Sequence, residues 1–199
     1  MEMIYKGAEA ELWRTTYLGI DAVEKRRVPK TYRIKEIDER IRRARVKKEA
    51  LMLIEARRAV KTPYILDVND KKMSITMEHI SGEKVRDAFY KGKKIRETSE
   101  KIGEAVRSLH DAGLIHGDLT TSNIIDAGGE LYFIDFGLAY NSHSLEDKAV
   151  DVLVLKKMLK STHWRYFDEI WGAFKKAYAD GEVLKKTEEI EKRARYAEH

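Results

Sequence analysis

The chain has 199 residues, of which 43% are hydrophobic and 37% charged, so it is long enough for one domain or two small lobes and too apolar for a disordered protein. It contains no cysteine, which excludes disulfides and thiolate metal sites, and its six histidines lack metal-ligand spacing. No stretch approaches the roughly 18 apolar residues of a membrane span, and the first residues do not resemble a secretion signal, so we expect a cytoplasmic protein.

The first third of the chain predicts β-strands, because β-branched and aromatic residues fill short segments that end at turn residues. We expect strands at residues 1–6, 10–17 and 20–28, with breaks at Gly7 and Gly19. These strands would begin a small β-rich lobe.

A long helix is predicted after Pro29, from about residue 36 to residue 60, and Pro63 ends it. Two further strands are expected at residues 65–68 and 73–78, which brings the lobe to five strands. The apolar spacing within the helix predicts the following inward-facing positions: Ile37, Ile41, Ala44, Leu51 and Ile54.

The rest of the chain is predicted to be mostly helical, beginning with a helix from about residue 95 that stops at Gly113. A hairpin with its turn at Gly128-Gly129 follows. Three more helices are expected, at residues 146–160, 164–179 and 182–196. Aromatic residues at helical spacing in the second of them predict a stripe that faces the core: Trp164, Phe167, Trp171, Phe174 and Tyr178.

This order of elements predicts an α+β fold with two lobes and a cleft between them. The N-lobe would hold the five strands and the long helix, and the C-lobe would be mainly helical. We place the joint at Ser81-Gly82, which gives an N-lobe of residues 1–80 and a C-lobe of residues 81–199.

Positive charge gathers between Lys25 and Lys61, where fifteen Lys and Arg stand against five Asp and Glu. One interpretation is a solvated helix face whose aliphatic stems pack over apolar neighbours. The other is a surface for a polyanion such as RNA. The sequence leaves both open, because the basic residues go round the helix without marking one stripe: Arg40, Arg42, Arg43, Arg45, Lys47 and Lys48.

The strongest functional signal is His116-Gly117-Asp118-Leu119-Thr120-Thr121-Ser122-Asn123, followed by Asp135-Phe136-Gly137. It fits the H-x-D-L-x-x-x-N catalytic loop and the D-F-G motif of protein kinases. Asn123 and Asp135 offer the oxygen ligands that Mg²⁺ needs beside the phosphates of ATP, and Asp118 can orient an acceptor hydroxyl. Gly137 is expected to let the backbone turn sharply beside the metal ligand.

An N-lobe of this kind should also supply a strand lysine for the phosphates and a helix glutamate to hold it. Lys25, on the third strand, matches the V-A-I-K position and is the candidate for the α- and β-phosphates. Glu49, in the long helix, is the best partner for Lys25. Its alternative role is a surface ion pair with Arg45, in which case Glu55 is the fallback partner.

The turn between the first two strands and the junction of the lobes would complete the nucleotide site. At the junction, backbone N–H and C=O groups of Glu78 and Ile80 would bind adenine, whereas the side chains of Glu78 and His79 are interpreted as a plain connection. His110 and His116 are expected to be structural. The turn keeps one glycine in place of G-x-G-x-x-G, and its backbone would cover the phosphates at Gly7, Ala8, Glu9 and Ala10.

Together, these residues resemble the small atypical kinase subunit of the KEOPS complex. The resemblance implies a Mg-ATP-dependent serine/threonine kinase or ATPase that supports threonylcarbamoyl modification of the tRNA adenosine beside the anticodon. It also implies a large transferase subunit on the C-lobe side, a small subunit on the N-lobe, and tRNA at the basic helix and C-terminal tail. The segments that carry it are residues 6–10, 25–33, 116–123, 135–138, 146–151 and 192–196.

Two departures from ordinary protein kinases agree with that resemblance. Gly117 replaces the arginine that elsewhere contacts a phosphorylated activation loop, and only Leu138 to Leu145 separate D-F-G from the next predicted helix. There is no A-P-E motif, so we expect no activation segment and poor recognition of generic peptides by this chain alone. A partner surface would have to complete the site.

Two alternatives stay open. A RIO-type kinase of ribosome assembly also lacks an activation loop and uses an H-G-D loop, although Phe136-Gly137-Leu138 after the metal aspartate argues against it. A nucleotide-binding scaffold could instead hold tRNA without transferring phosphate. Against it, all five polar positions remain occupied: Lys25, Glu49, Asp118, Asn123 and Asp135.

Overall fold

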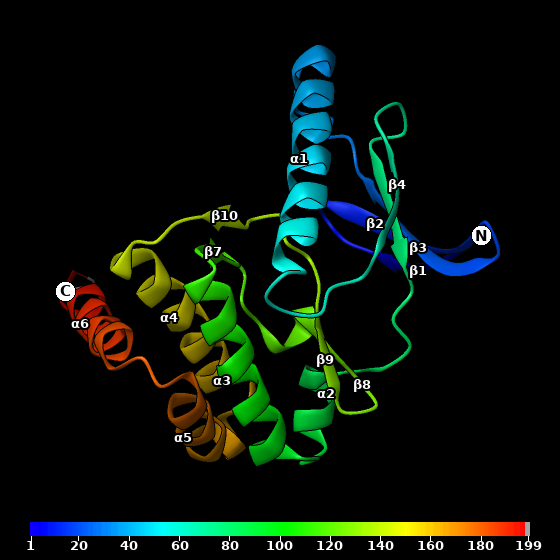
Figure 1. Ribbon diagram of the computed structural model, residues 1–199. Helices are drawn as coiled ribbons and strands as arrows, with labels where there is room; N and C mark the ends of the chain where they lie inside the picture. Colours follow the sequence, from blue (N-terminus) through cyan, green and yellow to red (C-terminus); the bar gives the residue numbers. More distant parts are fainter. Residues whose placement is uncertain (198–199) are drawn as a thin grey trace.

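The computed structural model describes residues 1–197, with side chains described as far as Ala194, and it has a β-sheet at one end and helices at the other (Figure 1). The sheet has five strands in the order β1-β2-β3-β5-β4, all antiparallel. Its strands are β1 (Glu2–Lys6), β2 (Ala10–Tyr17), β3 (Ile20–Arg27), β4 (Ile65–Asn69) and β5 (Ser74–Glu78). These are the segments in which the sequence predicted strands.

The long helix α1 (Lys35–Ala56) packs against this sheet, and its N-terminal end extends beyond it (Figure 1). Val46 and Ala50 of α1 meet Ile75 and Met77 of β5 in a small hydrophobic core. The C-terminal turns of the helix reach into a second, larger core among the other helices. The helix therefore ties the sheet to the rest of the molecule.

The predicted inward face of α1 is wrong. Ile37, Ala44, Leu51 and Ile54 are exposed, and Ile41 is only half-buried. Apolar residues lie on more than one face of this helix, so their spacing does not select the inner one, and ion pairs made by two buried acids help to fix it. The buried residues are Asp38, Val46, Glu49, Ala50, Met52, Leu53 and Ala56.

The remaining helices form the helical part of the molecule, in which α3 packs on α5 and α4 on α6. Phe89, Phe133 and Phe136 are fully buried in its core. Together with the sheet and α1, this part confirms the α+β, kinase-like fold class. The helices are α2 (Val85–Tyr90), α3 (Ile95–Asp111), α4 (Leu145–Thr162), α5 (Phe167–Tyr178) and α6 (Gly181–Ala197).

The aromatic stripe expected to face this core is present from Phe167 onward. The rings of Phe167, Trp171, Phe174 and Tyr178 stack in succession, with centroids 5.3 to 6.4 Å apart. Trp164 was wrongly included, because its side chain is 68% exposed. The 3₁₀ turn η2 (Trp164–Tyr166) precedes α5 and takes Trp164 out of the register of that helix.

The hairpin expected with its turn at Gly128-Gly129 is present as β8 and β9, and β6 adds a third strand to it in the order β6-β8-β9. The other short elements, among which β10 pairs with β7, escaped the sequence patterns because none is long enough to show a period. None of the helices within residues 1–197 combines the length and the apolar character needed to cross a membrane. The short elements are β6 (Glu83–Lys84), β7 (Leu114–Ile115), η1 (Thr121–Asn123), β8 (Ile124–Ala127), β9 (Glu130–Phe133) and β10 (Tyr140–Asn141).

Candidate active site

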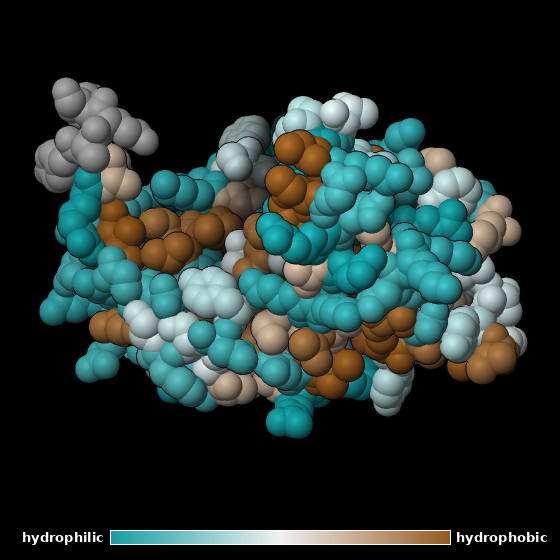
Figure 2. All heavy atoms as spheres, turned by 90° about the horizontal axis from the view of Figure 1, so that it is seen from above, coloured by the Kyte–Doolittle hydropathy of each residue, from teal (hydrophilic) through white to brown (hydrophobic). Residues whose placement is uncertain are grey.

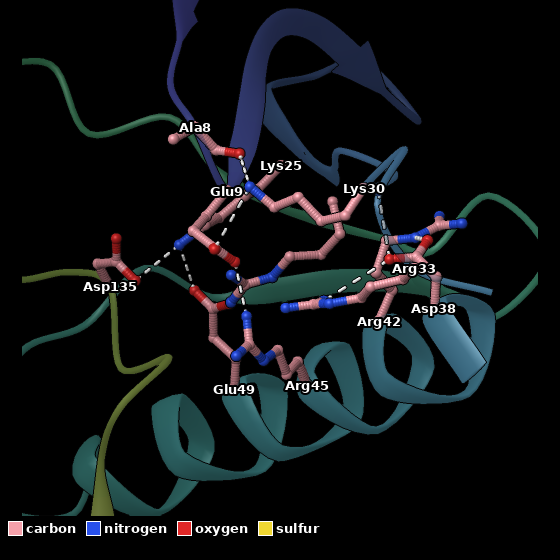
Figure 3. A network of polar contacts seen from close by, with 11 residues as sticks. Ala8, Glu9, Lys25, Lys30, Arg33, Asp38, Arg42, Arg45, Glu49 and Asp135 are labelled. Carbon is pink, nitrogen blue, oxygen red and sulfur yellow. Dashed lines mark hydrogen bonds and ion pairs between the residues drawn. The ribbon is translucent and has the colours of Figure 1, made fainter. Parts of the chain in front are cut away.

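Lys25 lies at the centre of the candidate site, on the stretch of β3 that faces α1. Its Nζ is 2.6 Å from Glu49 Oε1 and 2.7 Å from Asp135 Oδ1 (Figure 3). A strand, a helix and the loop after β9 therefore meet at one ammonium group. Because the Lys25 side chain is only 8% exposed, water screens these ion pairs less than it would at the surface.

Glu49 is fully buried and holds two cations. Its second carboxylate oxygen accepts a hydrogen bond from Arg27 Nη2, and Arg27 follows Lys25 by two residues, so both side chains lie on one face of β3. Sequence reasoning missed Arg27, although this spacing on a predicted strand was a visible signal. The surface alternative for Glu49 is wrong, and Glu55 instead accepts a hydrogen bond from Asn141.

Asp135 lies at the open end of this network, with its side chain 45% exposed. Its φ of 62° is in the left-handed region, which is uncommon for a residue with a side chain. Burial would raise the pKa of Asp135, but the charges of Lys25 and Arg27 more than offset this and hold the pKa below its ordinary value. Asp135 is therefore a carboxylate at neutral pH.

Two glycines lie beside these residues. Gly137 lies in the turn expected there, which is closed by a hydrogen bond of 3.1 Å from Ala139 N–H to Phe136 C=O, and a Cβ on Gly137 would lie 2.9 Å from Arg27 Nη2. Gly117 has φ +78°, and its Cβ would lie 2.6 Å from the carbonyl oxygen of Leu138. The arginine that ordinary kinases carry at the position of Gly117 has no room here.

The structure brings Asp118 and Asn123 into direct contact. Asn123 Nδ2 donates to the backbone oxygen of Asp118 at 2.9 Å and to its Oδ2 at 3.0 Å. This leaves the amide oxygen of Asn123 as an acceptor without a donor among the described residues. An amide oxygen and the half-exposed carboxylate of Asp135 are ligands of the kind that Mg²⁺ binds beside phosphates, so the donor set fits this metal.

Asp151, a buried acid of α4, anchors the catalytic loop from inside the helical part. Its carboxylate accepts hydrogen bonds from the backbone N–H groups of His116 at 3.0 Å and Gly117 at 2.9 Å. Sequence reasoning assigned Asp151 no role in the site. The available signal was an acid on the face of a helix that otherwise carries buried apolar residues.

A chain of hydrogen bonds continues from Asp151 to α5. His110 Nε2 lies 3.2 Å from Asp151, and His110 Nδ1 lies 2.7 Å from the hydroxyl of Tyr178. The carboxylate can only accept, so Nε2 carries a proton, and in the neutral form of the ring Nδ1 accepts from the Tyr178 hydroxyl. Burial raises the pKa of Tyr178, which keeps this donor protonated.

His116 contributes packing and one hydrogen bond to the loop. Its ring centroid lies 4.6 Å from that of Phe136, and its Nδ1 accepts from the backbone N–H of Asp118 at 3.3 Å. Burial lowers the pKa of His116, so its imidazole is neutral at pH 7. These contacts match the structural role expected of this histidine.

The turn at residues 7–10 lies over this network. Gly7 N–H donates to Ala10 C=O at 2.9 Å, and Lys30 Nζ donates to the backbone oxygen of Ala8. The Glu9 carboxylate lies 2.6 Å from Arg45 Nη1 and 3.5 Å from Lys30 Nζ (Figure 3).

At the junction between the sheet and the helical part, some backbone N–H groups are already hydrogen-bonded and one is available to a ligand. Glu78 N–H donates to Tyr64 C=O at 2.9 Å, and His79 N–H donates to Asp21 C=O at 3.1 Å. The N–H of Ile80 has no acceptor among the described residues. The Glu78 and His79 side chains turn to Tyr64 and Asp21, as connecting groups would.

The basic residues of α1 divide into two groups. Arg42 pairs with Asp38, Arg45 with Glu9 and Lys47 with Asp70. The others make no ion pair with any described residue: Lys35, Arg40, Arg43 and Lys48.

Comparison with protein families matches the protein kinase domain to residues 19–165. The chain belongs to the protein kinase domain family. Within that family, it is 36% identical over its whole length to a Pyrococcus abyssi protein named KEOPS complex subunit Bud32, of which it covers 97%. The chain is a member of the family of that subunit, and the resemblance seen in the sequence motifs is confirmed.

Longer archaeal proteins also match this kinase domain. A Methanosarcina mazei protein is 49% identical over 98% of the chain, and one from Methanothermobacter thermautotrophicus is 42% identical over 99%. Both are named probable bifunctional tRNA threonylcarbamoyladenosine biosynthesis protein. The chain spans 36% and 37% of their lengths.

Proposed function

We propose that the chain is a Mg-ATP-dependent enzyme that transfers the γ-phosphoryl group to a serine or threonine hydroxyl or to water. Its work would serve the KEOPS complex in threonylcarbamoyladenosine modification of tRNA. The observation that carries the proposal is the position of Lys25 Nζ between Glu49 and Asp135. Protein kinases use this arrangement of strand lysine, helix glutamate and D-F-G aspartate to bind the phosphates of ATP.

Each polar residue would have one task. Lys25 would bind the α- and β-phosphates, and Glu49 would hold it in place. Asn123 and Asp135 would hold Mg²⁺, which neutralises phosphate charge when bound. Adenine would be bound by backbone groups of Glu78 and Ile80, and the turn at residues 7–10 would cover the phosphates.

Asp118 would act on the attacking hydroxyl. The hydroxyl oxygen forms a bond to the γ-phosphorus while the bond from that phosphorus to the β–γ bridging oxygen breaks. The hydroxyl proton passes to the Asp118 carboxylate. The contact with Asn123 Nδ2 keeps that carboxylate beside the metal ligand, and Asp151 fixes the backbone that carries it.

The short connection after D-F-G supports dependence on a partner. It contains β10, which pairs with β7, and α4 begins at Leu145, so there is no separate platform for a peptide. We place the large transferase subunit on the helical side, where Leu138 is 62% and Leu145 41% exposed. The small subunit would dock on the sheet, where apolar side chains of β1 are exposed: Met3, Ile4 and Tyr5.

tRNA is the proposed polyanionic partner of α1. Seen from above, hydrophilic side chains cover most of the surface, with a few separate hydrophobic groups between them (Figure 2). Arg40, Arg43 and Lys48 are the stronger candidates, since Arg42 and Arg45 already have acidic partners. In the C-terminal tail, the other proposed contact, the side chains from Arg195 onward lie outside the described ones. Charge reversal at Arg43 should weaken tRNA binding and reduce the dependence of this binding on salt concentration. Binding of tRNA that does not depend on salt would favour the alternative interpretation of α1 as a solvated helix face.

ATP consumption by the chain, with and without the transferase subunit and tRNA, tests the function. We expect slow turnover alone, a marked change with the partner, and loss of turnover in Asp118→Asn, whose fold should persist. Full turnover in that variant, or vigorous phosphorylation of generic peptides by the isolated chain, would contradict the assignment. Co-purification with pre-ribosomes in place of a tRNA-modifying assembly would favour the RIO-type alternative.

A further inference from the structure

Two cations beside the candidate site, Lys30 and Arg45, have no role in the function proposed above. Lys30 lies in the connection between β3 and α1, and Arg45 lies on α1. Both reach the same acid, Glu9, whose carboxylate lies 3.5 Å from Lys30 Nζ and 2.6 Å from Arg45 Nη1. The Glu9 side chain is 52% exposed, against 41% for Arg45 and 16% for Lys30, so the acid is the most exposed member of the group.

Their location links these residues to the phosphates. Arg45 precedes Glu49 by four residues, so both point from one face of α1 toward β3. Glu9 belongs to the turn that would cover the nucleotide, and Figure 3 draws its ion pairs with Lys30 and Arg45 close to those of Lys25. Burial would raise the pKa of Glu9, but Lys30, Arg45 and Arg27 more than offset this and lower it, so Glu9 is an anion at neutral pH.

Among the side chains that these ion pairs join, positive charge exceeds negative charge. Four cations face three carboxylates. Asp135 would also turn to the metal when Mg²⁺ is bound. The cations are Lys25, Arg27, Lys30 and Arg45, and the carboxylates are Glu9, Glu49 and Asp135.

We propose that Lys30 and Arg45 form an anion subsite for the terminal phosphates of the bound nucleotide, and that the Glu9 carboxylate occupies this subsite while no phosphate is there. The inference rests on the proposed nucleotide-dependent function. A carboxylate carries one charge, whereas a terminal phosphate carries close to two and offers three acceptor oxygens, so the phosphate displaces Glu9. Lys30 also bonds the backbone of Ala8, so the turn stays attached while its acid moves aside.

The subsite predicts a selectivity that Lys25 alone does not. A ligand with β- and γ-phosphates reaches Lys30 and Arg45, whereas AMP does not. Removing either cation should therefore weaken ATP and inorganic tripolyphosphate and spare AMP. Removing the charge of Glu9 should instead strengthen the binding of ATP and tripolyphosphate, because the Glu9 carboxylate competes with the phosphates for the two cations.

Calorimetric binding of Mg-ATP, AMP and inorganic tripolyphosphate to the full chain tests this. Lys30→Gln and Arg45→Gln should each weaken ATP and tripolyphosphate about tenfold, the scale of one charge-assisted hydrogen bond, and change AMP less than about twofold. Glu9→Gln should tighten ATP and tripolyphosphate about threefold. Lys47→Gln is the matched control, since Lys47 lies on the same helix and pairs with Asp70 outside this network, and it should change none of the three.

The outcomes separate this subsite from the wider function. ATP affinity that is unchanged in Lys30→Gln and Arg45→Gln, or an equal loss for AMP and ATP, overturns the subsite and leaves the nucleotide site standing. A wild-type chain that binds neither ATP nor tripolyphosphate overturns both. Glu9→Gln changes an exposed side chain and should fold normally, so weaker ATP binding in that variant also contradicts the proposal.

Discussion

Two buried ion networks in this chain look alike but differ in what surrounds them. In the first, Glu49 binds Lys25 and Arg27. In the second, Glu191 of α6 binds Lys156 and Lys160 of α4 at 2.6 and 2.8 Å. In each network, a carboxylate of one helix binds two cations of another element.

The difference lies at the edge of each network. The first continues to a half-exposed carboxylate, Asp135, which adjoins the catalytic loop. In the second, the cations lie beside aromatic rings. Lys156 Nζ lies 5.3 Å from the ring centroid of Trp171, and Lys160, whose side chain is 43% exposed, has its Nζ 5.6 Å from the ring centroid of Phe167. A buried ion pair by itself therefore indicates packing as readily as chemistry, and the open carboxylate makes the distinction.

The largest expected effect comes from removing the lysine of each network. Lys25→Met should lower ATP turnover about a hundredfold or more, because a cation that stabilises phosphate charge is lost. Its fold should persist, since Glu49 keeps Arg27. Lys156→Met is the matched control, because Glu191 likewise keeps Lys160. Steady-state ATPase assays and thermal unfolding of both variants measure this difference. Equal ATP turnover in Lys25→Met and Lys156→Met would contradict the distinction between the two networks.

Glu191→Gln should break the second network without touching the first. It leaves two ammonium groups near apolar rings without their acid, and we expect the free energy of unfolding to fall by about 2 kcal/mol. Urea denaturation measures this loss. Turnover per folded molecule should stay at the wild-type level, and a drop in turnover beyond the unfolded fraction would show that the second network reaches the site.

Tyr178→Phe tests a third buried network. This network runs from Tyr178 of α5 through His110 and Asp151 to the backbone of the catalytic loop. The variant removes the donor to His110, so we expect a loss of about 1 kcal/mol in unfolding free energy and a fall in kcat of about threefold. The KM for ATP should not change, because the nucleotide contacts are intact. Lower stability with an unchanged kcat would leave Tyr178 a packing residue only.

The smallest effect concerns acid stability. Burial would raise the pKa of Glu191, but Lys156 and Lys160 more than offset it and lower the pKa to about 2, from 4.5. A lowered carboxyl pKa stabilises the fold above the unfolded-state value and loses this contribution as pH falls from 4.5 toward 2. The stability gap between wild type and Glu191→Gln should therefore shrink as the pH falls from about 5 to about 2 in urea titrations. A constant gap would contradict the pairing.

The sequence predicted the elements with clear periods and the residues with fixed chemistry. Strands β1 to β5 and the long helices are long enough to be predicted from their patterns, and the D-F-G motif identified Asp135 as a residue of the candidate site. The buried face of α1 could not be predicted from its own sequence, because it is fixed in part by ion pairs between Glu49 and two cations of β3, Lys25 and Arg27. Asp151 was missed for a similar reason, since its hydrogen-bond partners lie on a loop more than thirty residues away.

The most direct test of the central claim is a crystal structure of the chain with a non-hydrolysable ATP analogue and Mn²⁺ in place of Mg²⁺. We expect the anomalous signal of Mn²⁺ beside Asn123 and Asp135, and Lys25 in contact with the phosphates. A nucleotide bound elsewhere, or a Mn²⁺ signal remote from both residues, would contradict the account.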